Sequence, residues 1–263
     1  MKISKVVNAL ELFAPLPLQE SFDNAGLQVG LTETQEVSGV LLCLDVTEKI
    51  VDEAIKEGCN LIVSHHPLIF HKLSHISDED FVQRIVVRAI TNNIVIVSMH
   101  TNMDNAIGGV NYKIAEKIGI DKIELLGERK IIGDTEGASG VIGSLSKPMC
   151  ASDFITHIKQ VFKVECVQAN ELLRRDICRV AVCGGAGSFM LDDAIKAGAD
   201  AFITGEMHYH DFFDHEQQIQ IAVIGHYQSE QYTNEIFKSI IEDACPGVRC
   251  CLAQTNTNPI IYL

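Results

Sequence analysis

The sequence predicts an α/β protein composed of two related α/β/α-layered halves, whose sheets are mostly parallel or mixed. Two observations lead to this fold class. Apolar segments of strand length alternate with amphipathic segments of helical length, which is typical of parallel sheets covered by helices. A stretch from the first half of the chain also recurs in the second half, which indicates that the two halves share one architecture.

The first half contains three apolar segments that predict buried strands and three segments that predict helices. In chain order they are strand 37–46, helix 47–58, strand 59–66, helix 77–92, strand 94–100 and helix 109–119. Thr47 is a suitable N-cap for the first of these helices, and Gly58 is a suitable end. We expect Ser77 to open the second helix, with Asp80 placed for a capping box. Aliphatic residues near the N-terminus also recur at helical spacing.

The second half repeats this alternation. Its predicted elements are strand 177–183, helix 189–198, strands 199–206 and 221–226, a long helix 227–247 and a closing strand 248–255. Pro246 and Gly247 end the long helix. Residues 121–140 are more polar and richer in glycine, so we place a domain boundary near 125–135. The expected halves are 1–128, joined by the C-terminal segment 231–263, and 129–230.

The internal repeat is visible in two places. Residues 53–66 align with 193–206 around an identical Ala-Ile-Lys-x-Gly core, and an apolar strand follows in both. Residues 94–100 align in the same way with 220–226. One such match could arise by chance, but two in the same order indicate two related halves.

The composition disfavours several classes of function. Asp and Glu number 35 against 21 Lys and Arg, and the resulting charge of −14 disfavours nucleic acid as a partner because it repels the phosphate backbone. No apolar run approaches the roughly 18 residues of a membrane helix, and the N-terminus lacks the features of a signal peptide. The nine cysteines include no C-x-x-C pair, so we expect reduced, buried thiols in a cytoplasmic protein.

Candidate metal ligands follow the ends of the predicted strands, which is where open α/β sheets bind their ligands. His65 and His66 end one strand. Two other strands end in a histidine that a carboxylate follows four positions later, and these pairs are His100 with Asp104 and His226 with Glu230. We expect Glu230 on the first turn of a helix. We expect Asp104 in a loop, because two glycines precede the next helix.

These residues predict two divalent metal ions in the crevice between the halves. The expected ligands are His65, His66, Asp104, His226 and Glu230. Three imidazoles and two carboxylates exceed the roughly three protein ligands of one open zinc site, but they suit two ions about 3.5–4 Å apart. Mixed ligands of this kind admit Zn, Fe, Mn, Ni or Co. A lone strand-end histidine is usually structural, but the repeated pairing with carboxylates favours a metal site.

Other segments carry weaker signals. The glycine-rich stretch 183–187 lacks the Lys-Ser/Thr of a P-loop, so a tight strand-to-helix turn is favoured over a phosphate cradle. The stretch 205–215 is rich in ligand-type side chains, and it either lines the pocket or is the solvated start of a helix. His71, His75 and His157 are expected on the surface of loops or helices. No Ser-His-Asp or G-x-S-x-G arrangement indicates acyl transfer.

Five stretches of the chain resemble one known family. They are SFDNAGLQVG (21–30), SHHPLIF (64–70), HTNMDNAIGGVN (100–111), GADAFITGE (198–206) and GHYQSE (225–230). These stretches are spread over nearly the whole chain, and they resemble the NIF-three-like family, also catalogued as GTP cyclohydrolase I type 2. The family's metal-binding pattern falls on the five ligands named above, with His100 beside them as a pocket residue.

The resemblance implies properties that the residues alone do not show. Family members are two-domain α/β proteins that form ring-shaped homohexamers with a dinuclear metal centre facing the interior. Longer members carry an inserted domain in mid-chain, and this chain resembles the form without it. The catalogue name implies opening of the guanine ring of GTP.

Two hypotheses about function follow. The first is a metal-dependent hydrolase of a nucleotide-like small molecule, which would use the open coordination positions of two ions, with His100 or Glu206 moving protons. The alternative is a non-catalytic metal-binding regulatory or interaction protein. The open positions favour the first hypothesis, and the lack of a recognisable substrate motif favours the second.

Overall fold

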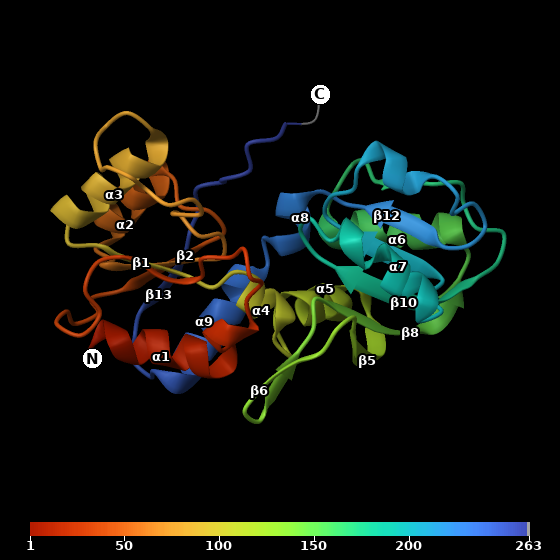
Figure 1. The fold of residues 1–263 in the computed structure, drawn as a ribbon, viewed down its shortest axis with the longest axis horizontal. Coiled ribbons are helices and arrows are strands. Elements are labelled where there is room, and N and C mark those ends of the chain that lie inside the picture. The colour runs from red at the N-terminus through yellow and green to blue at the C-terminus, as the bar shows by residue number, and fades with distance from the viewer. Residues whose placement is uncertain (262–263) are drawn as a thin grey trace. The chain divides into compact units, whose positions relative to one another are not determined.

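The computed structural model describes residues 1–261, which fold into two compact units. Unit 1 consists of Met1–Met103 together with the chain from Thr233 onward, and unit 2 consists of Asp104–Tyr232. Each unit has its own sheet with helices packed against it (Figure 1). Within the described residues, no helix is both long enough and apolar enough to cross a membrane.

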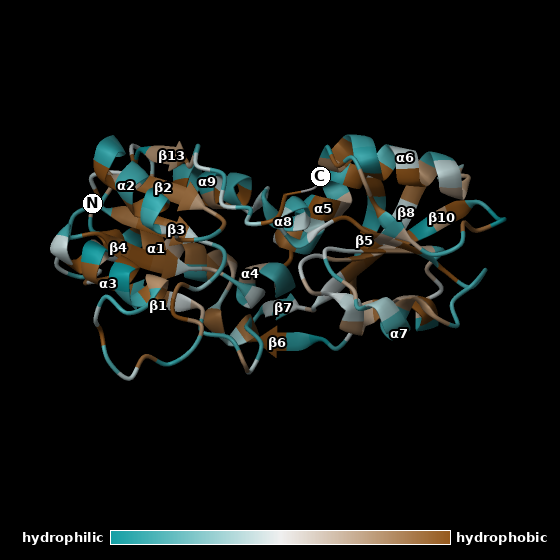
Figure 2. Cartoon of the chain, turned by 90° about the horizontal axis from the view of Figure 1, so that it is seen from above, coloured by the Kyte–Doolittle hydropathy of each residue, from teal (hydrophilic) through white to brown (hydrophobic). Residues whose placement is uncertain are grey.

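The sheet of unit 1 has five strands, and its three central strands are completely buried. In spatial order the strands are β1 (Gly26–Val29), β4 (Val95–Ser98), β3 (Leu61–Ser64), β2 (Val40–Cys43) and β13 (Cys250–Leu252). β2, β3 and β4 pair in parallel, and burial on both faces explains why they appear in the sequence as unbroken apolar runs. Figure 2 shows this sheet in the brown of apolar residues. Cys43, Ser64 and Ser98 lie side by side, so the three carboxyl ends are level.

Helices cover both faces of this sheet. They are α1 (Ile3–Phe13), α2 (Glu48–Glu57), α3 (Phe81–Thr91) and α9 (Thr233–Ala244), with a short 3-10 helix η1 at Leu16–Leu18. α2 and α3 lie on one side of the sheet, and α1 and α9 lie on the other (Figure 1). Beneath α2 and α3 the core joins Ile50 and Ala54 to Leu41 and Ile62. Burying each large aliphatic side chain of this core contributes roughly 1.5–3 kcal/mol.

Local sequence sets the ends of α2 and α3. Thr47 caps α2 by accepting a hydrogen bond from a backbone N–H of the first turn at 3.3 Å, and Gly58 ends it with a left-handed φ of 64°. Both predictions are confirmed. The predicted start of α3 at Ser77 is wrong. Asp80 is itself the N-cap, because its carboxylate accepts the N–H three residues later at 2.9 Å, so the helix starts after it.

The sheet of unit 2 has six strands and mixes parallel with antiparallel pairs. In spatial order they are β5 (Ile120–Leu126), β8 (Gly140–Met149), β10 (Ile177–Cys183), β11 (Ala201–Thr204), β12 (Gln220–Val223) and β9 (Gln168–Ala169), and a separate hairpin pairs β6 (Lys130–Ile132) with β7 (Thr135–Gly137). β10, β11 and β12 are parallel. They follow the same order as β2, β3 and β4, as the internal repeat predicts. The other pairs in this sheet are antiparallel.

Unit 2 also contains helices, all of which lie between residues 104 and 232 except the start of α4. They are α5 (Val110–Ile118), α6 (Ala151–Phe162), α7 (Leu191–Lys196) and α8 (His226–Glu230), with 3-10 helices η2 (Ser188–Met190) and η3 (Tyr209–Phe212), and α4 (Thr101–Asn105) spans the passage from unit 1. α5 and β5 pack against β8, so residues 104–128 group with unit 2. The observed boundary between residues 103 and 104 therefore differs from the one expected between residues 128 and 129. The last part of β8 is mostly polar and exposed, so the sequence does not show the apolar pattern of a buried strand there.

Two further expectations need correction. The single helix expected at 227–247 is two helices, α8 and α9, and the chain passes from unit 2 to unit 1 between them. No glycine or proline stands between residues 227 and 245, so the sequence shows no sign of the break. All nine cysteines are free thiols, but they are not all buried. Cys150, Cys166 and Cys178 are exposed, whereas Cys43, Cys59, Cys183 and Cys245 are buried.

One carboxylate fixes the segment that follows β13 to unit 1. β13 pairs in parallel with β2, and the Ala253 N–H continues this ladder to the Leu42 carbonyl at 2.9 Å. Glu53 on α2 then accepts hydrogen bonds from the backbone N–H groups of Gln254 at 2.7 Å and Thr255 at 3.0 Å. Burial opposes ionisation of Glu53, but these hydrogen bonds outweigh it and lower its pKa.

We expect Glu53 to make the stability of the protein depend on pH. Its lowered pKa means that the carboxylate stabilises the fold above the unfolded-state pKa of about 4.3, and that this stabilisation is lost as the pH falls through the folded-state pKa. Glu53→Gln should be less stable than wild type at neutral pH, and the two free energies of unfolding should converge on acidification. Urea denaturation followed by circular dichroism measures this, with the exposed Glu57→Gln as control. A difference that does not shrink at low pH would contradict the expectation.

Candidate metal centre

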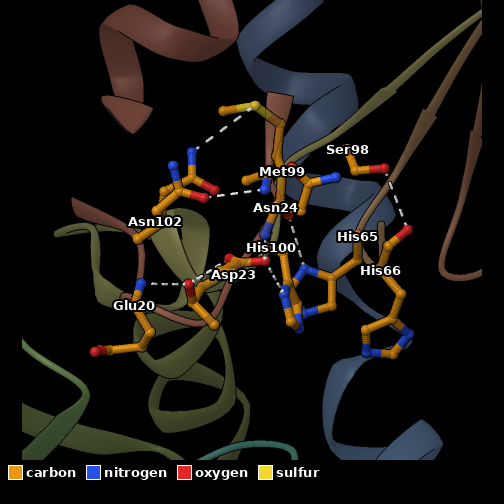
Figure 3. Close-up of polar contacts among 12 residues, drawn as sticks. Glu20, Asp23, Asn24, His65, His66, Ser98, Met99, His100 and Asn102 are labelled. Carbon is orange, nitrogen blue, oxygen red and sulfur yellow. Dashed lines mark hydrogen bonds and ion pairs between the residues drawn. The ribbon is translucent and has the colours of Figure 1, made fainter. Parts of the chain in front are cut away.

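Residues with ligand chemistry follow the level carboxyl ends of β2, β3 and β4 in unit 1. Asp45 follows β2, His65 and His66 follow β3, and His100 follows β4. These side chains therefore meet at one edge of the sheet, as expected for parallel strands. Figure 3 shows the three imidazoles beside one another, with ring centroids 4.9, 5.2 and 5.4 Å apart. One nitrogen of each ring lies within 4.8 Å of the others.

His65 is completely buried, and a backbone carbonyl fixes its protonation state. Its Nδ1 lies 2.9 Å from the Met99 carbonyl oxygen (Figure 3). A carbonyl oxygen can only accept a hydrogen bond, so Nδ1 carries the proton. Nε2 therefore carries the lone pair that a metal ion requires.

His66 is oriented by a carboxylate. Its Nδ1 lies 2.7 Å from Asp45 Oδ1. Burial opposes ionisation of Asp45, but the hydrogen bond from His66 and the charge of its ring outweigh burial and lower the Asp45 pKa. The ionised carboxylate accepts a hydrogen bond from the Nδ1–H group, so the lone pair of His66 also lies on Nε2.

His100, which the sequence predicts as a pocket residue and as a candidate for proton transfer, is held in the same way. Its Nδ1 lies 2.8 Å from Asp23 Oδ1, and the Asp23 side chain is shielded from solvent. Thr101 donates from its backbone N–H at 3.0 Å and from its hydroxyl to the other Asp23 oxygen. Burial opposes ionisation of Asp23, but the hydrogen bond and charge of His100, followed by Thr101, lower its pKa. Asp23 was not singled out from the sequence, because nothing in its own segment marks it as a partner of His100.

Asp104 lies on helix α4, and the expectation of a loop is wrong. The Met103 N–H bonds to the His100 carbonyl at 2.8 Å, which starts the helical turn directly behind the strand. The glycines act later, since Gly108 has a φ of 79° and separates α4 from α5. The Asp104 carbonyl accepts a hydrogen bond from Asn111 at 3.1 Å. In both repeats the carboxylate therefore lies on a five-residue helix that follows a strand, with His100 just before α4 and His226 as the first residue of α8.

His226 and Glu230 lie at opposite ends of α8 in unit 2, and the prediction that a helix starts at once behind the strand is confirmed. A separation of four residues places both side chains on one helix face. His226 Nε2 is 3.1 Å from Glu230 Oε2, and its Nδ1 is 3.1 Å from Glu206 Oε1. Glu230 is only 3% exposed. Two carboxylates around one imidazole favour a cation, because a buried charge needs a partner or a metal ion.

Two glycines make room for α8. Gly185 has a φ of 57°, and a Cβ there would overlap Glu230 Oε1. A Cβ on Gly205 would lie 2.8 Å from Ser229 Oγ and 2.9 Å from the Cα of His226. Ser229 Oγ accepts a hydrogen bond from the Gly185 N–H at 3.0 Å and donates to the His226 carbonyl at 2.7 Å. The position of Glu230 on α8 thus depends on glycine at 185 and 205, because a side chain at either position would overlap this helix.

The glycine-rich stretch 183–187 is a tight turn whose amides serve unit 2. The N–H groups of residues 184, 185 and 187 donate to the side chains of Asn111, Ser229 and Thr204 at 2.8, 3.0 and 3.1 Å. Amides used in this way do not form a phosphate cradle, so the favoured interpretation of this stretch as a turn is confirmed.

The remaining histidine-rich segments bring one further side chain into contact with a candidate metal ligand. In the stretch 205–215, Glu206 contacts His226, whereas His208 and His210 are exposed. His71 and His75 are exposed, as expected. His157, on α6, is half-buried, and its Nε2 lies 2.8 Å from the Ile118 carbonyl oxygen. Its ring nitrogen therefore serves packing between elements of unit 2.

Comparison with known proteins identifies the family. A family model described as Duf34/NIF3 (NGG1p interacting factor 3) matches residues 1–259. The chain belongs to this family. A NIF3 relative from Clostridium perfringens, described as a GTP cyclohydrolase 1 type 2 homolog, is 36% identical over 231 residues, which cover 88% of this chain and 87% of that protein. A relative of the same description from Streptococcus pneumoniae is 30% identical and covers 100% of both chains.

Solved structures of other proteins share the fold of this chain. A hypothetical protein from Staphylococcus aureus superposes with a TM-score of 0.90 at 27% identity and covers 100% of this chain and 99% of its own. A Bacillus cereus protein related to NIF3 superposes with a TM-score of 0.88 at 24% identity over the same shares. The family resemblance and the α/β class predicted from the sequence are both confirmed.

Gly185→Ala should lower the free energy of unfolding more than Gly133→Ala does. Both glycines have positive φ values, 57° and 60°, so both variants carry a similar backbone strain, about 1–2 kcal/mol for a left-handed residue. Only the methyl group at 185 also meets the Glu230 carboxylate, since a Cβ on Gly133 has nothing within 4 Å. Urea denaturation of both variants measures the difference. Equal losses would show that Glu230 does not need the glycine.

Proposed function

We propose that this NIF3-family chain binds two divalent metal ions through His65, His66, Asp104, His226 and Glu230, and that it uses them to hydrolyse a nucleotide-like small molecule. The hydrogen bonds at Nδ1 in unit 1 carry the proposal. His65 and His66 each donate a hydrogen bond from Nδ1–H to a fixed acceptor and keep the lone pair on Nε2. Metal-binding histidines are oriented by this kind of partner.

The donor set fits catalytic divalent ions. Imidazole and carboxylate ligands suit Zn, Fe, Mn, Ni or Co, and three imidazoles with two carboxylates leave coordination positions on two ions open for water and substrate. In unit 2 the paired carboxylates around His226 supply the negative charge that such ions need. Bound ions would supply Lewis acidity, and they would lower the pKa of a bound water molecule towards 7.

His100 is the better placed of the two proton-transfer candidates. Asp23 accepts a hydrogen bond from its Nδ1–H, so Nε2 is the basic nitrogen that can take a proton from a reacting group. The buried Asp23 carboxylate then stabilises the imidazolium that forms. Glu206 is instead engaged with His226 Nδ1, which gives it the task of orienting that ring.

The substrate class rests on the relatives. Those from Clostridium perfringens and Streptococcus pneumoniae are described as GTP cyclohydrolase 1 type 2 homologs, which supports a nucleotide-like substrate and hydrolytic opening of its purine ring. Assembly into a homohexamer belongs to the same proposal and rests on the family resemblance. Size-exclusion chromatography with light scattering tests the assembly separately from the chemistry.

Protein purified without added metal should contain two divalent ions per chain. His65→Ala should lose at least one of them, because it removes a buried Nε2 donor. Elemental analysis by plasma mass spectrometry measures the content. His75→Ala is the matched control, since His75 is exposed and pairs with Glu79. Wild-type protein that stays metal-free after incubation with Zn, Mn, Fe and Co would overturn the proposal.

Turnover of GTP by the metal-loaded protein should distinguish a residue that binds the metal from a residue that accepts a proton. Glu230→Ala should abolish both metal binding and turnover. His100→Ala should retain the metal but lose about a hundredfold or more in rate, the usual contribution of a positioned general base. Release of the ring-opened product is followed by chromatography. Wild-type protein that holds metal, turns over no nucleotide and loses its assembly when the metal is removed would instead support the non-catalytic alternative.

A further inference from the structure

We propose that Thr257 positions the His66 imidazole through Asp45, which makes the C-terminal segment a working part of the metal centre. The Thr257 hydroxyl donates to Asp45 Oδ2 at 2.7 Å, and Asp45 Oδ1 accepts from His66 Nδ1 at 2.7 Å. The inference rests on the proposed function, because it treats His66 as a metal ligand.

The two oxygens of Asp45 have separate tasks. Oδ1 holds the imidazole, and Oδ2 accepts the Thr257 hydroxyl. A carboxylate with a donor at each oxygen has a fixed plane, so the direction of its bond to His66 is also fixed. Without the hydroxyl, the half-buried carboxylate would lose a charge-assisted hydrogen bond and could rotate about its side-chain bond.

The backbone before Thr257 is anchored at successive positions. β13 pairs with β2, and the Ala253 N–H extends the ladder. Glu53 then holds the N–H groups of Gln254 and Thr255. Thr257 follows two residues later and reaches a carboxylate that is 212 positions away in the sequence. The segment thus delivers the hydroxyl from a defined backbone, which is what an orienting group needs.

The same arrangement occurs a second time in unit 1. Asp23 holds His100 with Oδ1 and accepts the Thr101 hydroxyl on Oδ2. Each carboxylate that orients an imidazole in this cluster therefore also receives a threonine hydroxyl on its other oxygen. The recurrence indicates that the hydroxyl is part of the support for the ring, because the two threonines come from unrelated segments of the chain.

The test compares Thr257→Val, which keeps the shape of the side chain, with Thr257→Ser, which keeps its hydroxyl. The full-length protein is titrated with Co²⁺ in competition with a chromogenic chelator, and the visible absorption of bound Co²⁺ is recorded. Removing a direct partner of a metal ligand weakens binding about 10–100-fold, so one bond further out we expect roughly threefold to tenfold for Thr257→Val. Its Co²⁺ spectrum should also change, while Thr257→Ser should match wild type in both measurements.

Thr91→Val is the control, because Thr91 is an exposed threonine whose hydroxyl bonds to α3 and to its neighbour Asn92, away from the candidate metal centre. Folded Thr257→Val protein with wild-type Co²⁺ affinity and spectrum would overturn the inference. Thr257→Ser as weak as Thr257→Val would also overturn it, since the hydroxyl would not be the cause. Wild-type protein that binds no Co²⁺ would overturn the proposed function itself, and with it this inference.

Discussion

The parallel register of β2, β3 and β4 is the constraint on which the candidate site of unit 1 depends. Cys43, Ser64 and Ser98 are neighbours across this ladder, so the residues directly behind them arrive at one edge of the sheet. A slip of one residue would shift a strand by about 3.3 Å and turn its side chains to the opposite face. Burial of all three strands penalises such a slip. The apolar core therefore also sets the spacing of the imidazoles.

Hydrogen-bond acceptors decide the chemistry of these imidazoles. A neutral imidazole can carry its proton on either nitrogen, and only the nitrogen without it can bind a metal ion. The acceptors at Nδ1 select the same tautomer for His65, His66 and His100. Placing carboxylates away from solvent for this purpose is unfavourable unless their oxygens are satisfied. The hydroxyl and backbone N–H of Thr101 at Asp23 and the hydroxyl of Thr257 at Asp45 meet that need.

The candidate ligands could be predicted from the sequence, because they follow strand ends and because one spacing occurs in both halves. Their partners could not. Asp23 lies 77 positions from His100, and Asp45 lies 21 positions from His66, and no local pattern connects either pair. The break between α8 and α9 left no mark in the sequence either, since no glycine or proline lies at it. Periodicity reports which face of an element is buried, but it does not report where the chain changes unit.

Strand β13 has a consequence for how the protein is made. It belongs to the sheet of unit 1 and pairs with β2, yet it follows the whole of unit 2 in the chain. On the ribosome, the edge of β2 must therefore stay uncovered while more than a hundred intervening residues are translated. Such non-local pairing is slow, and an uncovered edge is prone to aggregation. Unit 2, by contrast, is one continuous segment and can fold first. A nascent chain would reach a complete first unit only when its final strand emerges.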